Sequence, residues 1–432
     1  MFGILVALLM ARSAAELFAE VTLGPLHFNV PSVVGVLMIG LAALYFLVRK
    51  RPAWNPLSTG WAVWLVLLLP SVAVSFVSLG RPGLLAVREW VRLLSIAAVF
   101  YLAYALSREN PRRDGIRLLF LGLIFPLGAA FLQLIFHSGM VLYGQQRVMG
   151  TMTHPNSLAQ FLILFLGLTY NRARPSFRIP WIALLVAELA VLLATLNIGA
   201  FLMAAVLVGW IFIRENRRGR ALLLGLGVLF GLLFLANRNA QVKMKMFESL
   251  APAKIAKSIQ PFPDSSLRAR GQNASVKAPV FQQRYRNSVS FRFGNWAQLV
   301  RLWEEKPWLG HGLQTTGLLN PYKDENGNGY SPHNDFIRYL FESGVFGLLA
   351  YCGFLAFSAI RIAKAVRGSP AAAGPSLPWV LAGVFLAWQI GSLADNMIST
   401  TAFQFFFWAA WGFVLGRRGE SAPVASAPPA VP

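Results

Sequence analysis

Residues 32–51 have the sequence SVVGVLMIGLAALYFLVRKR, a predominantly apolar run that ends in three basic residues. A helix of about twenty apolar residues is long enough to cross the roughly 30 Å hydrocarbon layer of a bilayer. Basic residues in a short turn favour the cytoplasmic side. This stretch therefore predicts a membrane helix whose carboxyl end faces the cytoplasm.

The same pattern recurs along the chain and predicts about twelve membrane-spanning helices. Their expected segments are 2–20, 32–48, 61–79, 91–107, 117–136, 157–170, 179–196, 200–213, 221–236, 340–360, 379–395 and 400–415. A basic cluster follows every second segment, from residues 49–51 to residues 417–418. This alternation predicts that both termini are cytoplasmic.

Composition agrees with an all-α polytopic membrane protein. Hydrophobic residues make up 56% of the 432 residues and charged residues only 13%, whereas soluble domains carry about 25% charged residues. Much of the net charge of +22 lies in the expected cytoplasmic turns, so we expect no nucleic-acid partner. The single cysteine, Cys352, excludes an intrachain disulfide framework.

The expected organisation has four parts. Residues 1–236 hold nine membrane helices, of which the first lacks the basic start of a secretory signal and is expected to be retained. Residues 237–333 form one large extracytoplasmic loop, with fourteen basic and six acidic residues. Residues 334–418 hold three more helices, and residues 419–432 form a disordered cytoplasmic tail rich in Ala, Pro and Ser.

A polar motif, Ser331-Pro332-His333-Asn334-Asp335, comes directly before the tenth expected span. Ser331 suits a helix N-cap and Pro332 the first helical position, which would place His333 in the first turn. The positive end of a helix dipole disfavours imidazolium, and a neutral imidazole can act as a general base on a hydroxyl. The alternative is a polar helix cap at the membrane surface.

A second motif precedes the sixth expected span and contains His154, Pro155 and Asn156. It has the same arrangement of a proline near a helix start, and its simpler interpretation is again a turn with a cap. Arginines such as Arg88, Arg147 and Arg292 fall on the same outer side. One guanidinium group can bind two phosphate oxygens at once, so these arginines predict a pyrophosphate site. The alternative is a basic surface attracted to anionic lipid.

Two further patterns involve acidic residues. The residues Asp324, Asn326, Asn328 and Asp335 follow the spacing of a calcium-binding loop. A polar turn is the better explanation, because Asp replaces the usual bidentate Glu and Pro332 occupies position nine. Ionisable residues at membrane depth are functional candidates, and the sequence has such residues at Glu188, Arg338, Glu342 and Asp395. Arg338 and Glu342 are four residues apart on a helix and can pair with each other.

Three stretches, in this order, resemble the O-antigen ligase and polymerase family of membrane glycosyltransferases. They are GTMTHPNSLA at 150–159, RFGNWAQLVRLWEEKPWLGHG at 292–312 and SPHNDFIRYLFESGVFG at 331–347. The resemblance implies a GT-C-like helical fold in the bacterial inner membrane. It also implies inverting transfer of a glycan from undecaprenyl pyrophosphate to an acceptor hydroxyl outside the cytoplasm, without a metal or other cofactor. The acceptor would be lipid A–core or another glycan.

The resemblance also suggests roles for individual residues. His333 matches the family's base, and Arg292 matches its loop arginine, expected to hold the pyrophosphate. His154, Asn156, Asn334 and Arg338 are the expected substrate-binding residues. One departure is clear: Ile198 stands where the family carries an arginine, and Arg88 or Arg147 is the candidate substitute.

Two other functions compete with a ligase. A repeat-unit polymerase uses the same donor, and the sequence does not separate its acceptor from that of a ligase. A polysaccharide flippase belongs to another class, because transporters usually show internal repeats, broken helices and charges at the membrane midplane. In this chain the charges are at the rims and one loop is very long, which favours the transferase.

Overall fold

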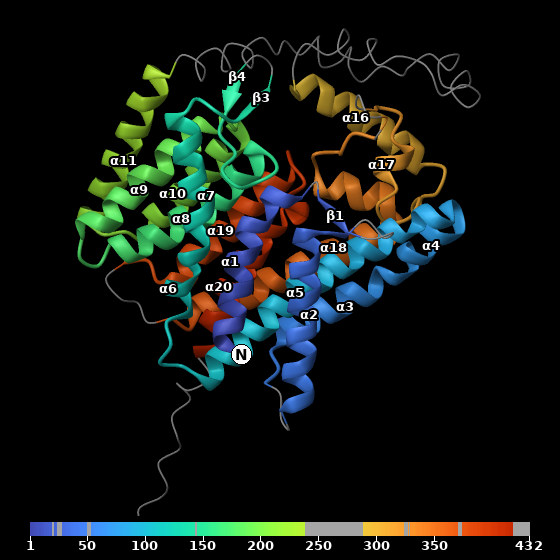
Figure 1. Ribbon diagram of the computed structural model, residues 1–432, viewed down its shortest axis with the longest axis horizontal. Helices are drawn as coiled ribbons and strands as arrows, with labels where there is room; N and C mark the ends of the chain where they lie inside the picture. Colours follow the sequence, from blue (N-terminus) through green and yellow to red (C-terminus); the bar gives the residue numbers. More distant parts are fainter. Residues whose placement is uncertain are drawn as a thin grey trace, which may run out of the picture.

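The computed structural model describes residues 1–19, 21–23, 28–49, 53–142, 145–237, 288–323, 327, 329–369 and 374–417. Within these residues the chain is almost entirely helical, with two small two-stranded hairpins (Figure 1). The expected all-α fold is therefore confirmed for the described part of the chain. The tail 419–432 and most of the expected outer loop lie outside it.

The elements of the first half of the chain are α1 (Phe2–Ala15), η1 (Glu16–Phe18), β1 (Thr22–Leu23), β2 (Phe28–Asn29), α2 (Val30–Val48), α3 (Pro56–Leu67), α4 (Leu69–Leu79), η2 (Arg81–Gly83), α5 (Leu84–Glu109), α6 (Gly115–Leu119), α7 (Leu121–Ile135), β3 (Met140–Leu142), β4 (Gln145–Arg147), α8 (Pro155–Ala173), α9 (Ile179–Ala194), α10 (Ile198–Ile213) and α11 (Arg217–Ala236). The strands pair antiparallel, β1 with β2 and β3 with β4.

The second half contains α16 (Ser288–Trp303), α17 (Thr316–Leu319), α18 (Asp335–Arg367), α19 (Leu377–Ser392), η3 (Met397–Ser399) and α20 (Thr401–Arg417). The apolar face predicted in residues 292–306 belongs to α16. The Pro/Gly turn at 307–312 follows this helix, as expected from its sequence.

Each of the twelve expected segments overlaps an α-helix or, in two cases (61–79 and 117–136), a consecutive pair of α-helices. Six helical stretches are long and apolar enough to cross a membrane: 30–48, 56–79, 84–109, 115–135, 217–236 and 335–367. Three further apolar helices, α9, α10 and α19, are shorter. The polytopic character is therefore supported, and the number of twelve crossings stays a prediction.

Helices α5 and α20 pack closely in the interior of the bundle, and two glycines make this possible. A Cβ atom at Gly412 would lie 2.7 Å from the carbonyl oxygen of Phe100, and one at Gly416 would lie 2.4 Å from that of Tyr104. Glycines spaced four residues apart let membrane helices approach through their backbones. This contact holds the carboxyl-terminal half of α20 against α5. At the other end of α20, Arg92 of α5 donates to the carbonyl of Ile398 (2.8 Å) and to the hydroxyl of Thr401 (3.1 Å).

Helix α18 is bent at Gly344, whose φ of 64° is left-handed. The bend breaks the helical hydrogen bonds, and the carbonyls of Phe341 and Glu342 accept instead from the backbone N–H groups of His311 (3.1 Å) and Gly312 (2.7 Å). A side chain at position 344 would collide with backbone atoms of the same loop, at 2.3 Å. The turn that follows α16 is thus fastened to the bend of α18.

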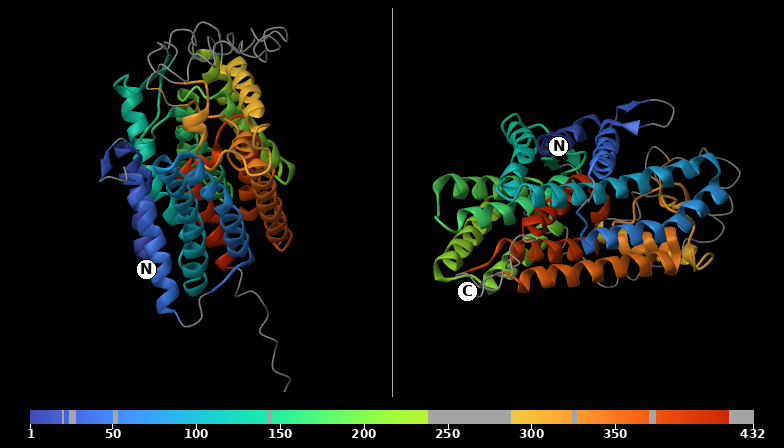
Figure 2. Two further views of the ribbon diagram at one scale, coloured as in Figure 1. Left: turned by 90° about the vertical axis from the view of Figure 1, so that its right-hand side faces the viewer. Right: turned by 90° about the horizontal axis from the view of Figure 1, so that it is seen from below.

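The polar motifs of the sequence gather at one end of the bundle. Figure 1 shows α16, α17 and the β3–β4 hairpin at the end away from the amino terminus, and the left view of Figure 2 agrees. The loops that enter α8 and α18 are at this same end. The expected outer side of the membrane corresponds to it.

The charge pattern makes a topology prediction. Reporter fusions after Arg220 and Arg367 are expected to be cytoplasmic, because each follows a basic cluster, and a fusion near Asn273 is expected to be external. Paired enzymatic reporters that are active on opposite sides of the membrane measure this. A cytoplasmic signal at Asn273 contradicts the whole orientation.

Candidate functional site

His333 lies in the loop that enters α18, with a left-handed φ of 51°. The N-cap of α18 is Asn334, whose side-chain oxygen accepts from the N–H groups of the second and third helical residues at 2.9 and 3.0 Å. The prediction that Ser331 caps the helix and that His333 belongs to its first turn is therefore wrong by three positions. Asn is at least as good a cap as Ser, and the N–H of Asn334 is also held by Asn396 (3.0 Å).

A clamp of three side chains fixes the backbone directly before His333. The carbonyls of residues 330, 331 and 332 accept hydrogen bonds, in order, from Asn320 (2.7 Å), Asn295 (3.2 Å) and Trp296 (2.5 Å). Asn320 also donates to the side-chain oxygen of Asn295 at 2.8 Å. Non-glycine residues at positive φ are strained and need such support from their surroundings. Two residues of α16, together with Asn320, therefore hold the backbone from which the side chain of His333 projects.

Asp395 is the partner of that imidazole and the centre of a polar cluster. Its Oδ1 lies 3.0 Å from His333 Nδ1 and accepts the N–H of Asn396 at 2.9 Å. Its Oδ2 accepts from the side-chain amides of Asn156 (3.2 Å) and Gln160 (2.9 Å). When Nδ1 donates to the carboxylate, Nε2 of the same ring is left as the basic nitrogen. The helix dipole argument does not apply, because His333 precedes α18. The hydrogen bond to Asp395 is instead the reason to expect that Nε2 can act as a base.

Asp395 remains ionised far below neutral pH. Burial raises the pKa of its carboxyl, but the hydrogen bond and charge of His333, together with the charge of Arg292, outweigh this and lower the pKa to about 2. The residue is in the loop after α19, because that helix ends at Ser392 and not at residue 395 as the hydropathy suggested. A permanent carboxylate thus faces the imidazole.

Arg147, on β4, continues the cluster from its far side. The side chain is 5% exposed, and it donates to Asn156 Oδ1 at 2.9 Å and to the carbonyl of Thr195 at 2.6 Å. Thr195 opens the turn that leads to Ile198, the first residue of α10 and the position at which the resemblance led us to expect an arginine. Arg147, from a different part of the chain, thus contacts the turn at 195–198, in which the expected arginine is replaced by Ile198.

The structure accordingly brings together four of the residues chosen from the sequence: His333, Arg292, Arg147 and Asn156. Arg292 is one turn before Asn295 on α16, and its charge acts on Asp395. His154 is at the edge of this group, as the N-cap of α8, and its Nδ1 accepts the N–H of Asn156 at 3.0 Å. The predicted cap with Pro155 in the first turn is confirmed here.

Arg338 is placed differently from the prediction that it binds substrate. Its guanidinium is buried and donates to Glu89 (2.8 Å), Glu342 (3.1 Å) and Ser399 (2.6 Å), so the expected pairing with Glu342 is confirmed. Arg92 holds the other side of Glu89 through two bonds of 2.7 Å. This ion network ties α5 and α18 to the η3 loop, and we assign Arg338 a positioning role.

Asn334 and Arg88 are placed apart from the cluster around Asp395. Asn334 is buried, and every polar group of its side chain serves the fold, since its amide nitrogen donates to the carbonyl of Leu393 at 3.0 Å in addition to the cap. Arg88 lines a cavity whose lining contains neither His333 nor Arg292. Neither residue belongs to the cluster around Asp395.

Of the four residues predicted to bind calcium, only Asp335 lies within the described part of the chain. Asp335 is fully buried, and its Oδ2 accepts from Ser392 Oγ (2.9 Å) and the N–H of Ile398 (3.0 Å). The other three proposed ligands, at 324, 326 and 328, lie outside the described residues. Among the residues that are described, no group of three or more His, Cys, Asp or Glu side chains is placed to hold a metal ion.

Two members of the cluster were not identified as site residues from the sequence. Asp395 stood out only as an ionisable residue near a span, which was the available signal. Gln160 is on α8, one helical turn after Asn156, on the same face. The four-residue spacing can be read from the sequence, but the sequence does not show that both side chains donate to the carboxylate of Asp395.

The clamp predicts a specific effect for Trp296→Phe. The change removes the N–H donor to residue 332 and keeps an aromatic ring, so the imidazole of His333 loses one support. A hydrogen bond of about 1 kcal/mol corresponds to an about fivefold lower kcat, and KM for the donor is expected to stay constant. Trp303→Phe is the matched control: Trp303 is on the same helix, and its N–H donates to the carbonyl of Pro307 (3.0 Å) in the turn that follows. An equal loss in both variants contradicts a specific role for the clamp.

Comparison with known proteins gives one family. Residues 181–352 match the family described as O-antigen ligase, a region that runs from α9 through α16 and the His333 loop into α18. This finding confirms the resemblance drawn from the sequence motifs. A search of curated proteins found no match to the chain.

Proposed function

We propose, from the O-antigen ligase family match over residues 181–352, that this protein is a membrane glycosyltransferase of surface polysaccharide synthesis. In this proposal it takes a glycan from undecaprenyl pyrophosphate and attaches it to an acceptor hydroxyl on the outer side of the bacterial plasma membrane. The family supports a ligase- or polymerase-like reaction in a membrane, and the donor and acceptor are our inference.

The observation that carries the proposal is the contact of 3.0 Å between His333 Nδ1 and Asp395 Oδ1. With Nδ1–H held by the carboxylate, Nε2 can accept the proton of the acceptor hydroxyl. The acceptor oxygen then attacks the anomeric carbon, while the bond from that carbon to the pyrophosphate oxygen breaks. A single displacement of this kind inverts the configuration at the sugar.

The leaving pyrophosphate needs neutralisation as its charge grows. Arg292 and Arg147 both approach the cluster around Asp395, one from α16 and the other from β4. Guanidinium groups can bind two phosphate oxygens each, so this proposal requires no metal ion. Arg147 would serve in place of the arginine that Ile198 replaces.

The acceptor distinguishes a ligase from a polymerase, and profiling surface glycans after gene deletion tests the choice. Complete glycan that accumulates on its lipid carrier indicates a ligase, and surface glycans of a single repeat unit indicate a polymerase. Accumulation of lipid-linked glycan on the cytoplasmic side contradicts both and indicates a flippase.

Arg292→Ala is expected to weaken donor binding, because it removes a cation from the proposed pyrophosphate site. Arg292→Lys should restore binding only in part, since an ammonium group cannot grip two oxygens as a planar fork. The measurement is the donor KM in a reconstituted transfer assay. Arg301→Ala is the control, an exposed arginine on the same helix. Full activity of Arg292→Ala removes the proposed role.

A further inference from the structure

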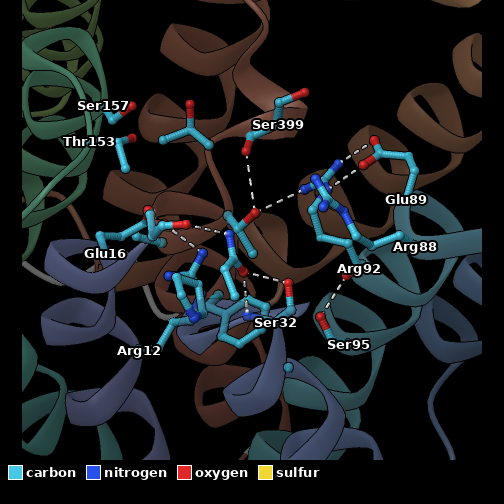
Figure 3. A pocket seen from close by; sticks show the side chains of 18 of the residues that line it. Arg12, Glu16, Ser32, Arg88, Glu89, Arg92, Ser95, Thr153, Ser157 and Ser399 are labelled. Carbon is cyan, nitrogen blue, oxygen red and sulfur yellow. Dashed lines mark hydrogen bonds and ion pairs between the residues drawn. The ribbon is translucent and has the colours of Figure 1, made fainter. Parts of the chain in front are cut away.

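A cavity of about 350 Å³ opens beside the cluster of Asp395, within the usual size of small-molecule sites, roughly 300–1,000 Å³. Its walls come from α1, η1, α2, α5, the loop before α8, and the η3–α20 segment (Figure 3). Thr400 on its wall donates to Gln160, which in turn donates to Asp395. The cavity therefore adjoins the proposed active site and shares one wall with it.

Arg12 contributes an unusual group to this cavity. The side chain is 3% exposed and forms an ion pair with Glu16 at 2.6 Å, yet its Nε and Nη1 atoms are buried without any hydrogen-bond partner. Buried N–H groups normally find acceptors, and an orphaned one costs stability. Arg12 also lies within the first expected membrane segment, 2–20, where a charged residue is a functional candidate because charge is costly in the bilayer. The guanidinium lies over the ring of Phe405, 5.6 Å from its centroid, at the wall of the cavity. Its place in the lining and its unused N–H groups make Arg12 a candidate contact for an acceptor from outside the chain.

A second cation faces the cavity from α5. Within the part of the chain that the structure describes, Arg88 forms no hydrogen bond or ion pair, and it is exposed. Its neighbour Glu89 is already neutralised by Arg92 and Arg338, and Glu16 is neutralised by Arg12. The lining therefore carries one positive charge that no described carboxylate balances.

The remaining polar lining is neutral and rich in hydroxyl groups. Figure 3 shows Arg12 and Glu16 on one side of the cavity, Arg88 and Arg92 on the other, and the side chains of Ser32, Thr153, Ser157 and Ser399 around them. A ligand that fits these walls has an oxyanion for the arginines and hydroxyl groups for the serines and threonines. A carboxylated or phosphorylated sugar has both features.

We propose that this cavity binds an oxyanion borne on a sugar, with Arg12 and Arg88 as its cationic contacts. The biological ligand rests on the proposed function, in which two sources have this chemistry. One is an acidic residue of the acceptor glycan, and the other is the first sugar and pyrophosphate of the donor. Binding itself does not depend on transfer activity.

The test measures binding of glucuronate, glucose 1-phosphate and glucose to the purified full-length protein in detergent by titration calorimetry. The two anions are expected to bind at least about tenfold more tightly than neutral glucose. Arg88→Gln should remove this preference. The charge-balanced pair Arg12→Gln with Glu16→Gln should do the same without leaving a lone buried carboxylate. Arg301→Gln is the matched control and should bind like the wild type.

His333→Gln separates this proposal from the proposed function, since it should lose transfer and still bind both anions. In transfer assays, Arg88→Gln raises the acceptor KM if the acceptor supplies the anion, and the donor KM if the donor does. Equal affinity for the anions and glucose overturns the proposal, as does an undiminished preference for anions in both Arg88→Gln and the double variant.

Discussion

His333→Gln is expected to reach the membrane at normal levels and to lose most of its glycan transfer. Glutamine keeps a hydrogen-bonding group beside Asp395 but offers no nitrogen that can accept the acceptor's proton. General base catalysis typically contributes about 10²–10⁴-fold in rate, so the loss in kcat should fall in this range. Donor binding should survive, because the arginines of the cluster are unchanged.

The left-handed backbone at His333 allows a second variant that guards against a folding defect. Asparagine tolerates positive φ better than most residues, so His333→Asn should keep the loop and still lack the base. His137→Asn is the matched control: this exposed histidine also has positive φ, at 46°, and lies outside the cluster. Transfer near the wild-type rate in either His333 variant would show that His333 only positions substrate. A loss in His137→Asn would point to a general effect of the substitution.

Local sequence signals were sufficient to predict most of the fold. Hydropathy detects a membrane helix because burial in lipid requires an apolar run of fixed length, and each expected segment overlaps a helix for this reason. The differences from the predicted segments are at the ends of helices and at breaks between helices. Pro70 near the start of α4 interrupts the expected segment 61–79. Asn334, rather than Ser331, is the N-cap of α18, because Asn396 and Leu393, which are distant in the sequence, hold it in place.

The site was predictable only as separate pieces. The histidine and the arginines could be chosen by their chemistry, but the contact of His333 with Asp395 spans 62 residues and depends on where a loop turns after α19. Arg338 is a second example. The resemblance suggested a substrate-binding role, and nothing in the sequence indicated that Glu89, 249 positions away, is its partner. Pairings of this kind are set by tertiary packing, which local patterns do not record.

Asp395→Asn is expected to lower kcat by at least about 10²-fold. In serine proteases, replacing the carboxylate behind the catalytic histidine by an amide costs about 10⁴-fold, because the ring then adopts the wrong tautomer. The amide is also mismatched here in either orientation. Its nitrogen must face the donors Asn156 and Gln160 or the donors His333 and Asn396.

A reciprocal exchange separates catalysis from folding. In the double variant Asp395→Asn with Asn156→Asp, the carboxylate moves to the neighbouring position, where Arg147 already donates to residue 156. The net charge and the bond between the two side chains are kept, so the melting temperature should recover much of its loss. The rate should remain low, because no carboxylate faces His333. Recovery of kcat together with stability would mean that Asp395 acts only as a structural hub.

The pH dependence of stability gives an independent check on the same carboxylate. The pKa of Asp395 is about 2 in the folded protein, whereas an unperturbed aspartate has a pKa of about 3.9. A carboxyl whose pKa is lowered by folding stabilises the protein above the unfolded value and loses this contribution as the pH falls toward the folded one. The stability gap between wild type and Asp395→Asn should therefore narrow as the pH falls below about pH 4. Melting temperatures of the two proteins across this range measure it, and a gap that narrows between pH 7 and 5 would contradict the ionised Asp395 on which the orientation of His333 depends.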